Sequence, residues 1–260
     1  MGKFLMQEQL GQAAIVTYRN PPQNVWTLEA VDELSAAVTA LGARRDIRAL
    51  VLTGAGDTHF SGGSDGAALI AGGRGYAERW VDAWGRALEA LERYPGVTVA
   101  ALNGTALGVG LACALACDYL VAERELVLAM PDARLGLVPL AGTSKRLVDK
   151  VGLAWAKRIL LGGEELDAEL ACRIGLVEEL VDPGFAKIVG LSLASKVAHQ
   201  GAQAVAATRE LLRGAGEATL AQQGQREREV FLRLATGEEA REGLAAAEAG
   251  RAPAWFLDED

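Results

Sequence analysis

The sequence predicts an α/β fold with a helical C-terminal region, and three observations support this. Apolar runs of strand length recur at 13–18, 49–53 and 97–102 (AAIVTY, ALVLT, VTVAAL). Segments with the apolar spacing of helices separate these runs. After Ala141 the pattern is mostly helical, with one short strand-like piece at 176–181. Strands that alternate with helices are typical of a parallel sheet.

The first helix is expected directly after a proline-containing loop, RNPPQNVW at 19–26. Thr27 is a suitable N-cap residue, and Glu29 lies in the first turn, where a carboxylate is favourable. Apolar residues then recur on one helical face as far as Leu41. We therefore expect a helix that begins after Thr27 and buries one face.

The segment from His59 to Gly75 (HFSGGSDGAALIAGGRG) follows the second strand. It contains too many glycines for a single rigid element, so we expect a binding loop with a mobile tail. From 76 to 94, the spacing of tryptophan and leucine residues predicts an amphipathic helix that ends at a Pro-Gly pair.

The central stretch at 103–118 (NGTALGVGLACALACD) follows the third strand and contains Gly104, Gly108 and Gly110. A short run of small apolar residues comes after these glycines, so the pattern predicts a strand, a glycine turn and a buried helix. Such a turn lets a ligand approach the backbone, and a helix N-terminus stabilises negative charge. The turn suits a dinucleotide pyrophosphate, a phosphate or an oxyanion formed during catalysis.

The composition limits the kind of protein and of partner. With 260 residues, half of them apolar, the chain is long enough for one large domain, or one domain plus a helical appendage. A net charge of −8, without a run of Lys and Arg, argues against nucleic acid and an anionic membrane surface. We expect a small-molecule partner.

Cysteines and apolar segments indicate the cellular compartment. Cys113, Cys117 and Cys172 lie in apolar helical runs, so we expect buried free thiols and not a disulfide framework. Neither the N-terminal segment nor any later one is apolar over the length that a signal peptide or a membrane span needs. These features predict a cytoplasmic protein.

A nicotinamide enzyme is one alternative, because Gly104, Gly108 and Gly110 fit the spacing G-x-x-x-G-x-G that resembles short-chain dehydrogenases. That fingerprint belongs near the start of a chain, and no tyrosine here is followed by lysine four residues later. The alternative G-x-G-x-x-G spacing ends at Cys113 and therefore fails.

A serine hydrolase is a second alternative, because GGSDG at 62–66 satisfies G-x-S-x-G around Ser64. A nucleophile elbow needs an apolar strand before the serine and a helix directly after it. Polar residues precede this motif, glycines interrupt the segment after it, and His199 is the single histidine in the usual chain order.

An oxyanion-stabilising enzyme is the third alternative, and here several spaced motifs resemble one family. The segments RNPPQN, FSGGSD, NGTALGVGLACALACD and PDARLGLVPLAGTSKRL occur in order between Ala13 and Asp182. They are similar to the proline-asparagine loop, F-C-A-G-A-D, N-G-x-A-x-G-G-G-x-x-x-x-x-x-C-D and P-E-x-x-L-G motifs of the crotonase (enoyl-CoA hydratase/isomerase) superfamily. The resemblance implies a crotonase-like spiral of ββα units with a helical C-terminal region.

The resemblance also implies a substrate and a site. Family members bind an acyl-CoA thioester and hold its carbonyl oxygen with two backbone amides, which correspond here to those of Ser64 and Val109. No metal and no cofactor is expected beyond the coenzyme A portion of the substrate, or an acyl carrier protein in its place. By the same resemblance, substrate-binding positions are Gln23, Val25, Gly62, Gly63, Ser64, Gly66, Gly108 and Gly110.

The acid and base groups depart from the family pattern. Hydratases of this family use two glutamates, and the matching positions here are Ala112 and Asp132. Addition of water needs one group to activate the water and another to deliver a proton, whereas moving a proton between two carbons needs one base. Isomerisation of an enoyl-CoA with Asp132 as the catalytic carboxylate is therefore favoured over hydration. The alternative that Asp132 is a structural carboxylate, in a site whose chemistry lies elsewhere, stays open.

Two further activities stay open. Branches of the superfamily that lack both glutamates decarboxylate malonyl-type or glutaconyl-type thioesters, and polar residues of the segment 76–82 are candidates to hold such a carboxylate. The second open possibility is a protein that binds acyl-CoA without catalysis. For organisation, we expect a core at 1–195, a helical trimerisation or lid region at 196–260, and a homotrimer or dimer of trimers by family resemblance.

Overall fold

The computed structural model describes residues 2–256, which divide into two compact units. The first unit ends at Ala194 and the second begins at Ser195. Residues 257–260 of the region predicted at 196–260 lie outside the described residues. The function of that region in trimerisation or as a lid stays a prediction.

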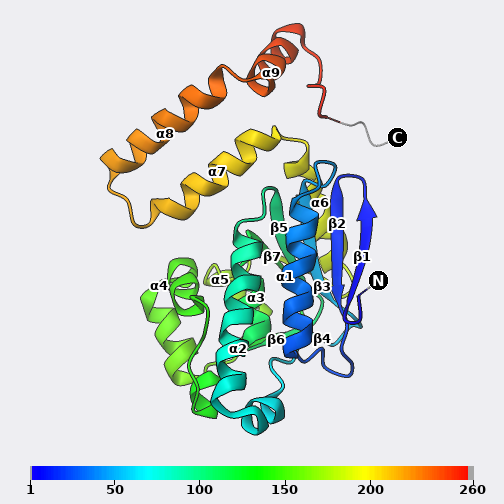
Figure 1. Ribbon diagram of the computed structural model, residues 1–260, viewed down its shortest axis with the longest axis vertical. Coiled ribbons are helices and arrows are strands. Elements are labelled where there is room, and N and C mark those ends of the chain that lie inside the picture. The colour runs from blue at the N-terminus through cyan, green and yellow to red at the C-terminus, as the bar shows by residue number, and fades with distance from the viewer. Residues whose placement is uncertain (1, 257–260) are drawn as a thin grey trace. The chain divides into compact units, whose positions relative to one another are not determined.

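A six-stranded sheet forms the centre of the first unit (Figure 1). Its strand order is β1-β2-β3-β5-β7-β10, and all neighbours are parallel except β1 and β2. The strand bounds are Leu5–Leu10, Ala13–Tyr18, Ala49–Gly54, Val97–Leu102, Tyr119–Glu123 and Glu179–Val181. Every residue of β3 and β5 is buried, as expected for parallel strands covered on both faces.

A second sheet has four short strands in the order β4-β6-β8-β9. Strands β4, β6 and β8 are parallel to one another, and β9 is antiparallel to β8. Their bounds are His59–Ser61, Thr105–Leu107, Val127–Ala129 and Leu166–Asp167.

Successive strands alternate between the two sheets. Strands β3, β5 and β7 lie side by side in the large sheet, and each is followed by one strand of the small sheet, β4, β6 or β8. A helix comes next: α2 (Gly66–Glu92) after β4, α3 (Val109–Leu115) after β6, and the short 3-10 helix η1 (Asp132–Leu135) with α4 (Thr143–Gly162) after β8. The expected spiral of ββα units is present.

Helix α1 (Leu28–Gly42) begins where the sequence predicts, because the Ala30 N–H donates to Thr27 Oγ1 at 3.2 Å. It lies beside α2, and both bury one apolar face (Figure 1). The remaining helices are α5 (Ala168–Arg173), α6 (Ala186–Ala198), α7 (Ala202–Ala215), α8 (Leu220–Ala235) and α9 (Glu238–Ala249). Among residues 2–256, no helix has the length and apolar character needed to cross a bilayer.

The expectation of a binding loop with a mobile tail from His59 to Gly75 was wrong for the tail. A short loop at 62–65 joins β4 to α2, and the rest of the segment forms the first turns of α2, which Asp65 caps by accepting from the Ala68 N–H at 3.1 Å. Its glycines interrupt the helix at one point, Gly73, where φ is 56° and ψ is −157°. The cap and this single break accommodate the glycines without loss of helical structure on either side.

Candidate active site

The three predicted catalytic positions follow the ends of three neighbouring parallel strands. Ser64 comes after β4, Val109 after β6 and Asp132 after β8. Because the carboxyl ends of parallel strands lie at one edge of a sheet, the fold brings these three segments together. Positions far apart in sequence therefore share one edge of the small sheet.

Val109 is the first residue of α3, so its N–H has no acceptor in a preceding helical turn. Gly108 precedes it with φ 50° and ψ −120°, a conformation that favours glycine. The Gly108 N–H donates to the Ala129 carbonyl at the end of β8, 2.9 Å away. This bond fixes the turn that presents the Val109 amide.

Two glycines permit the close approach of the Ser64 segment and the Val109 segment. A Cβ on Gly110 would lie 2.5 Å from Ser61 Cβ, so a side chain there would clash with the end of β4. Gly63 has a φ of 99°, and its Cβ would lie 3.4 Å from the Leu107 carbonyl oxygen. The glycine motifs therefore pack the two segments against each other.

The Ser64 amide is oriented by a parallel β-bridge between Ser64 and Trp26. The Trp26 N–H donates to the Gly63 carbonyl at 2.8 Å, and the Asp65 N–H donates to the Trp26 carbonyl at 3.1 Å. In such a bridge, the N–H of the residue between the two bonds points away from the partner strand. The Ser64 N–H is thus directed away from Trp26.

Asp132 begins η1 directly after Pro131 and is half-buried. Its Oδ2 is buried and makes no hydrogen bond within the residues that the structure describes. Burial raises the pKa of the Asp132 carboxyl above its ordinary value, and a hydrogen bond from its own backbone lowers it in part. A carboxylate with a raised pKa is suited to accept a proton.

Ala112 occupies the position that the family resemblance assigns to the first glutamate. It is 1% exposed on α3, between the buried residues Leu111 and Cys113. Burial raises the pKa of the Cys113 thiol, which keeps this thiol neutral near pH 7. The surroundings of Ala112 are therefore apolar. Cys113 and Cys117 are buried and form no disulfide with the described residues, whereas Cys172 is half-buried.

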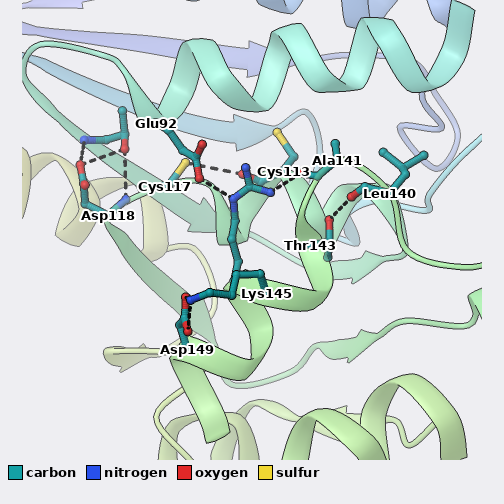
Figure 2. Close-up of polar contacts among 11 residues, drawn as sticks. Glu92, Cys113, Cys117, Asp118, Leu140, Ala141, Thr143, Lys145 and Asp149 are labelled. Atoms are coloured by element: carbon teal, nitrogen blue, oxygen red, sulfur yellow. Dashed lines mark hydrogen bonds and ion pairs between the residues drawn. The ribbon is translucent and has the colours of Figure 1, made fainter. Parts of the chain in front are cut away.

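The loop that follows Asp132 is fixed at its far end by α4 (Figure 2). Thr143 Oγ1 donates to the Leu140 carbonyl at 2.7 Å. The Arg146 guanidinium donates to the Ala141 carbonyl at 2.5 Å and to Glu92 Oε1 at 2.6 Å. Ala141 has a φ of 52°, which is uncommon for a residue with a Cβ. These contacts hold the Ala141 backbone in that conformation.

The predicted substrate-binding residues lie on three segments: Gly108 and Gly110 at the start of α3, and the others on two loops that adjoin each other. The Gly62 N–H donates to the Gln23 carbonyl at 2.7 Å, which joins the loop before α1 to the loop before α2. Val25 lies in the first of these loops, and its carbonyl accepts from the Tyr18 hydroxyl and from Asn20 Nδ2, both at 2.6 Å. Gly66 is the first residue of α2. Binding of coenzyme A at these residues stays a prediction.

The polar residues considered for a decarboxylase lie on α2 beyond the break at Gly73. The Arg79 guanidinium carbon is 5.8 Å from the centre of the Tyr76 ring, and Glu78 pairs with Arg74 across one helical turn. These interactions occur within one helix, so they are equally compatible with an exposed helix face.

Comparison with known proteins identifies the family. A family model described as enoyl-CoA hydratase/isomerase matches residues 8–256. The chain belongs to the enoyl-CoA hydratase/isomerase family. The similarity extends well beyond the motifs between Ala13 and Asp182, and the predicted membership of the crotonase superfamily is confirmed.

Individual relatives resemble this hydratase/isomerase chain along most of their length. A probable enoyl-CoA hydratase of Rhizobium meliloti is 34% identical over 249 residues, 93% of each chain. A 2,3-dehydroadipyl-CoA hydratase of Escherichia coli is 32% identical over 88% of this chain and 87% of its own. The chain is thus an acyl-CoA enzyme of the enoyl-CoA hydratase/isomerase type.

Solved structures of the family share the whole fold. The structure of DspI from Pseudomonas aeruginosa superposes with a TM-score of 0.94 at 41% identity, covering 98% of this chain and 97% of DspI. An enoyl-CoA hydratase from Bacillus anthracis gives a TM-score of 0.93 at 26% identity, covering 98% of this chain and 99% of the hydratase. The crotonase-like fold predicted from the sequence is confirmed.

Two contributors to the site were not identified from the sequence. Trp26 orients the segment of Ser64, and Arg146 fixes the loop that carries Asp132. Trp26 acts through the backbone of a distant segment, whereas Arg146 binds the nearby Ala141 carbonyl and the side chain of the distant Glu92. The sequence pattern does not reveal these contacts, although the loop 19–26 and the R-L pair of the last motif did mark the segments that contain them.

Proposed function

We propose that the protein isomerises the double bond of an enoyl-CoA thioester through an enolate. The observation that supports this is one half-buried carboxylate, Asp132, together with an alanine, Ala112, in the position of the first family glutamate. The amides of Ser64 and Val109 are assigned to the thioester oxygen. Removal of one such donor lowers turnover by roughly a hundredfold to a thousandfold in comparable sites.

In the proposed reaction, Asp132 removes a proton from the carbon between the thioester carbonyl and the double bond of a 3-enoyl substrate. The electron pair of that C–H bond moves into an enolate whose oxygen is held by the two amides. The Asp132 carboxyl then returns the proton to the fourth carbon, and the double bond ends beside the carbonyl. One group serves as base and as acid, so no second carboxylate is required.

Hydration is the second candidate, because several relatives, including those of Rhizobium meliloti and Escherichia coli, are named hydratases. It needs a group to activate water and another to protonate carbon. With Ala112 in the first glutamate position, the chain would have to supply that second group from elsewhere. We therefore rank hydration below isomerisation.

Mass spectrometry of thioester products in heavy water separates these activities. We would offer 3-enoyl-, 2-enoyl- and malonyl-type CoA substrates in parallel. An isomerised product that carries deuterium, without added water, is the expected result. Gain of water would establish hydration and a second acid or base, whereas loss of CO2 would establish a decarboxylase. Binding of all three thioesters without any product would contradict the proposed reaction.

A further inference from the structure

We propose that Trp26 is a positioning residue that fixes the amide of Ser64 through its backbone, with its indole ring as the anchor. The proposal rests on the proposed function in one respect, the assignment of the Ser64 amide to the thioester oxygen. Trp26 itself does not touch the substrate in this scheme. Its effect reaches the reaction through the direction of one N–H bond.

The backbone of Trp26 binds both neighbours of Ser64. Its N–H donates to the Gly63 carbonyl at 2.8 Å, and its carbonyl accepts from the Asp65 N–H at 3.1 Å. The Gly63 carbonyl and the Ser64 N–H belong to one planar trans peptide group and point in opposite directions, so the bond to this carbonyl fixes the direction of the N–H. The bond from Asp65 fixes the next peptide group as well. The direction of this amide therefore depends on where the Trp26 backbone is held.

The indole ring holds that backbone in place. Trp26 is 1% exposed, and its ring is stacked on Tyr18 with 3.7 Å between ring centres and an angle of 2°. Its edge meets the ring of Trp84 at 5.3 Å and 76°. Stacked and edge-to-face arrangements are those that aromatic rings prefer. The ring is thus fixed on two sides.

The residue before Trp26 is held as well. The Val25 carbonyl accepts from the Tyr18 hydroxyl and from Asn20 Nδ2, each at 2.6 Å. Tyr18 therefore contacts this short segment twice, by its ring on Trp26 and by its hydroxyl on Val25. The segment has no freedom to move away from the Ser64 loop without loss of both contacts.

The indole nitrogen contributes nothing to this anchoring. Trp26 Nε1 is buried and has no hydrogen-bond partner within residues 2–256, which is unfavourable for a polar group. The ring is therefore used for its shape and its faces. Phenylalanine offers a ring without the buried N–H, so Trp26→Phe should retain the positioning while Trp26→Leu should lose it.

Kinetics distinguish positioning from general stability. An oxyanion donor acts mainly in the transition state, so its displacement lowers kcat and leaves KM nearly unchanged. For Trp26→Leu we expect a fall in kcat of roughly tenfold to a hundredfold, with Trp26→Phe close to wild type. The matched control is Trp80→Leu, because Trp80 is 3% exposed and also meets Trp84, at 5.9 Å, but does not bind the Ser64 segment through its backbone in a bridge as Trp26 does.

Two measurements are independent of turnover. Amide hydrogen exchange of residues 62–66 should speed up in Trp26→Leu and stay at the wild-type rate in Trp80→Leu. The carbonyl stretch of ¹³C-labelled butanoyl-CoA should shift to lower frequency on binding to wild type, and this shift should diminish in Trp26→Leu. If Trp26→Leu does not fold, Tyr18→Phe takes its place in this experiment. It removes only the hydroxyl that holds the Val25 carbonyl, so it should increase the exchange rate by a smaller amount.

Each contrary result is distinct. Wild-type exchange at 62–66 in both Trp26→Leu and Tyr18→Phe would overturn the positioning role. Equal loss of kcat in Trp26→Leu and Trp80→Leu would assign the effect to stability and overturn it too. A wild-type protein that binds butanoyl-CoA without any carbonyl shift would instead refute the oxyanion site, and with it the part of the proposal that depends on the proposed function.

Discussion

Asp132 brings two opposing requirements together in one side chain. Its Oδ2 is buried without a hydrogen bond in the described part of the chain, and burial raises the pKa of the carboxyl. The same burial that makes the carboxylate a better base makes its charged form unfavourable in the folded protein. A residue selected only for stability would not be placed in this way.

Replacement of Asp132 by asparagine should separate activity from stability. We expect kcat for the isomerisation to fall roughly a hundredfold to ten-thousandfold, because the proton carrier is lost. We also expect the melting temperature at neutral pH to rise, because a half-buried charge is removed. Thioester turnover and thermal unfolding on the same preparations check both. Full turnover in Asp132→Asn would exclude Asp132 from the reaction.

The raised pKa of Asp132 also sets the direction of two pH dependences. The active form is the carboxylate, so kcat/KM should decline as the pH falls through the folded-state pKa, which lies above the ordinary aspartate value. The folded state binds this proton more tightly than the unfolded chain. The contribution of Asp132 to stability is therefore fully present below the unfolded-state pKa and lost as the pH rises through the folded-state pKa. Asp132→Asn should remove both trends.

At the scale of elements, the start of α3 depends on the backbone of Gly108. Its φ of 50° and ψ of −120° are unfavourable for any residue with a Cβ. A Cβ at this position would meet only Pro131 Cδ, at 4.0 Å, so substitution changes conformation and not packing. Gly108 is thus a position at which the direction of the Val109 amide can be altered without a steric clash.

Gly108→Ala should therefore lower both stability and activity. We expect a loss of about 2 kcal/mol in the free energy of unfolding and a fall in kcat of roughly a hundredfold, because the Val109 amide is displaced. The matched control is Gly163→Ala at the end of α4, which also has a positive φ, 63°. Gly163→Ala should lower the free energy of unfolding by about 1 kcal/mol and leave kcat unchanged. Urea unfolding and steady-state kinetics check the pair, and equal kcat in both variants would contradict the role of Gly108.

The contacts of α4 with the Asp132 loop allow a second paired test. Arg146→Met removes the bonds to Glu92 and to the Ala141 carbonyl, and the Arg146 and Glu92 side chains are only 16% and 35% exposed. We expect a loss of about 2 to 3 kcal/mol in the free energy of unfolding. Lys145→Met removes the neighbouring pair with Asp149, about half exposed and also drawn in Figure 2, and should cost at most about 1 kcal/mol.

Urea unfolding at one fixed protein concentration measures this difference. The Arg146→Met variant should also show faster hydrogen exchange at residues 138–142, because the Ala141 carbonyl in this segment loses its donor. Similar stability and exchange in the Arg146 and Lys145 variants would mean that the loop is held by other contacts.

The elements differ in how far the sequence predicts them. The buried strands β2, β3 and β5 are continuous apolar runs, and the cap at Thr27 is a local signal, so both were found. Strands β4, β6 and β9 have two or three residues each, too few for a periodic pattern, and exist through their pairing in the small sheet, where β4 pairs with β6 and β9 with β8. Strand β1 was missed because four of its six residues are exposed.

The candidate site shows the same contrast. The segments of Ser64, Val109 and Asp132 could be identified because their motifs resemble a family. The bridge between Trp26 and Ser64 could not, because it joins the backbones of two loops that only the folded chain brings together. Motifs predict which segments form the site, whereas the contacts that orient them are properties of the tertiary structure.

At the scale of the whole molecule, the second unit has more apolar surface than its own helices bury. Helix α8 is well formed, with a capping box between Thr219 and Gln222, yet it has no buried residue. In α7 only Ala207 is buried. Leu212, Leu220, Phe231 and Leu244 are each exposed by 67% or more. An amphipathic helix whose apolar face is exposed is typical of a surface that pairs with another chain.

The family resemblance implies a homotrimer or a dimer of trimers, and the exposed apolar faces lead us to expect the second unit at its contacts. Light scattering should give a mass of three or six times 27.3 kDa. Replacement of Phe231 and Leu232 by serine should reduce that mass, because it removes two apolar side chains that are 69% and 52% exposed. Ile70→Ser on α2, at a side chain that is 87% exposed in the first unit, should leave the mass unchanged. A wild-type monomer at micromolar concentration would contradict this assembly, and the exposed faces of α7 and α8 would then need a different partner.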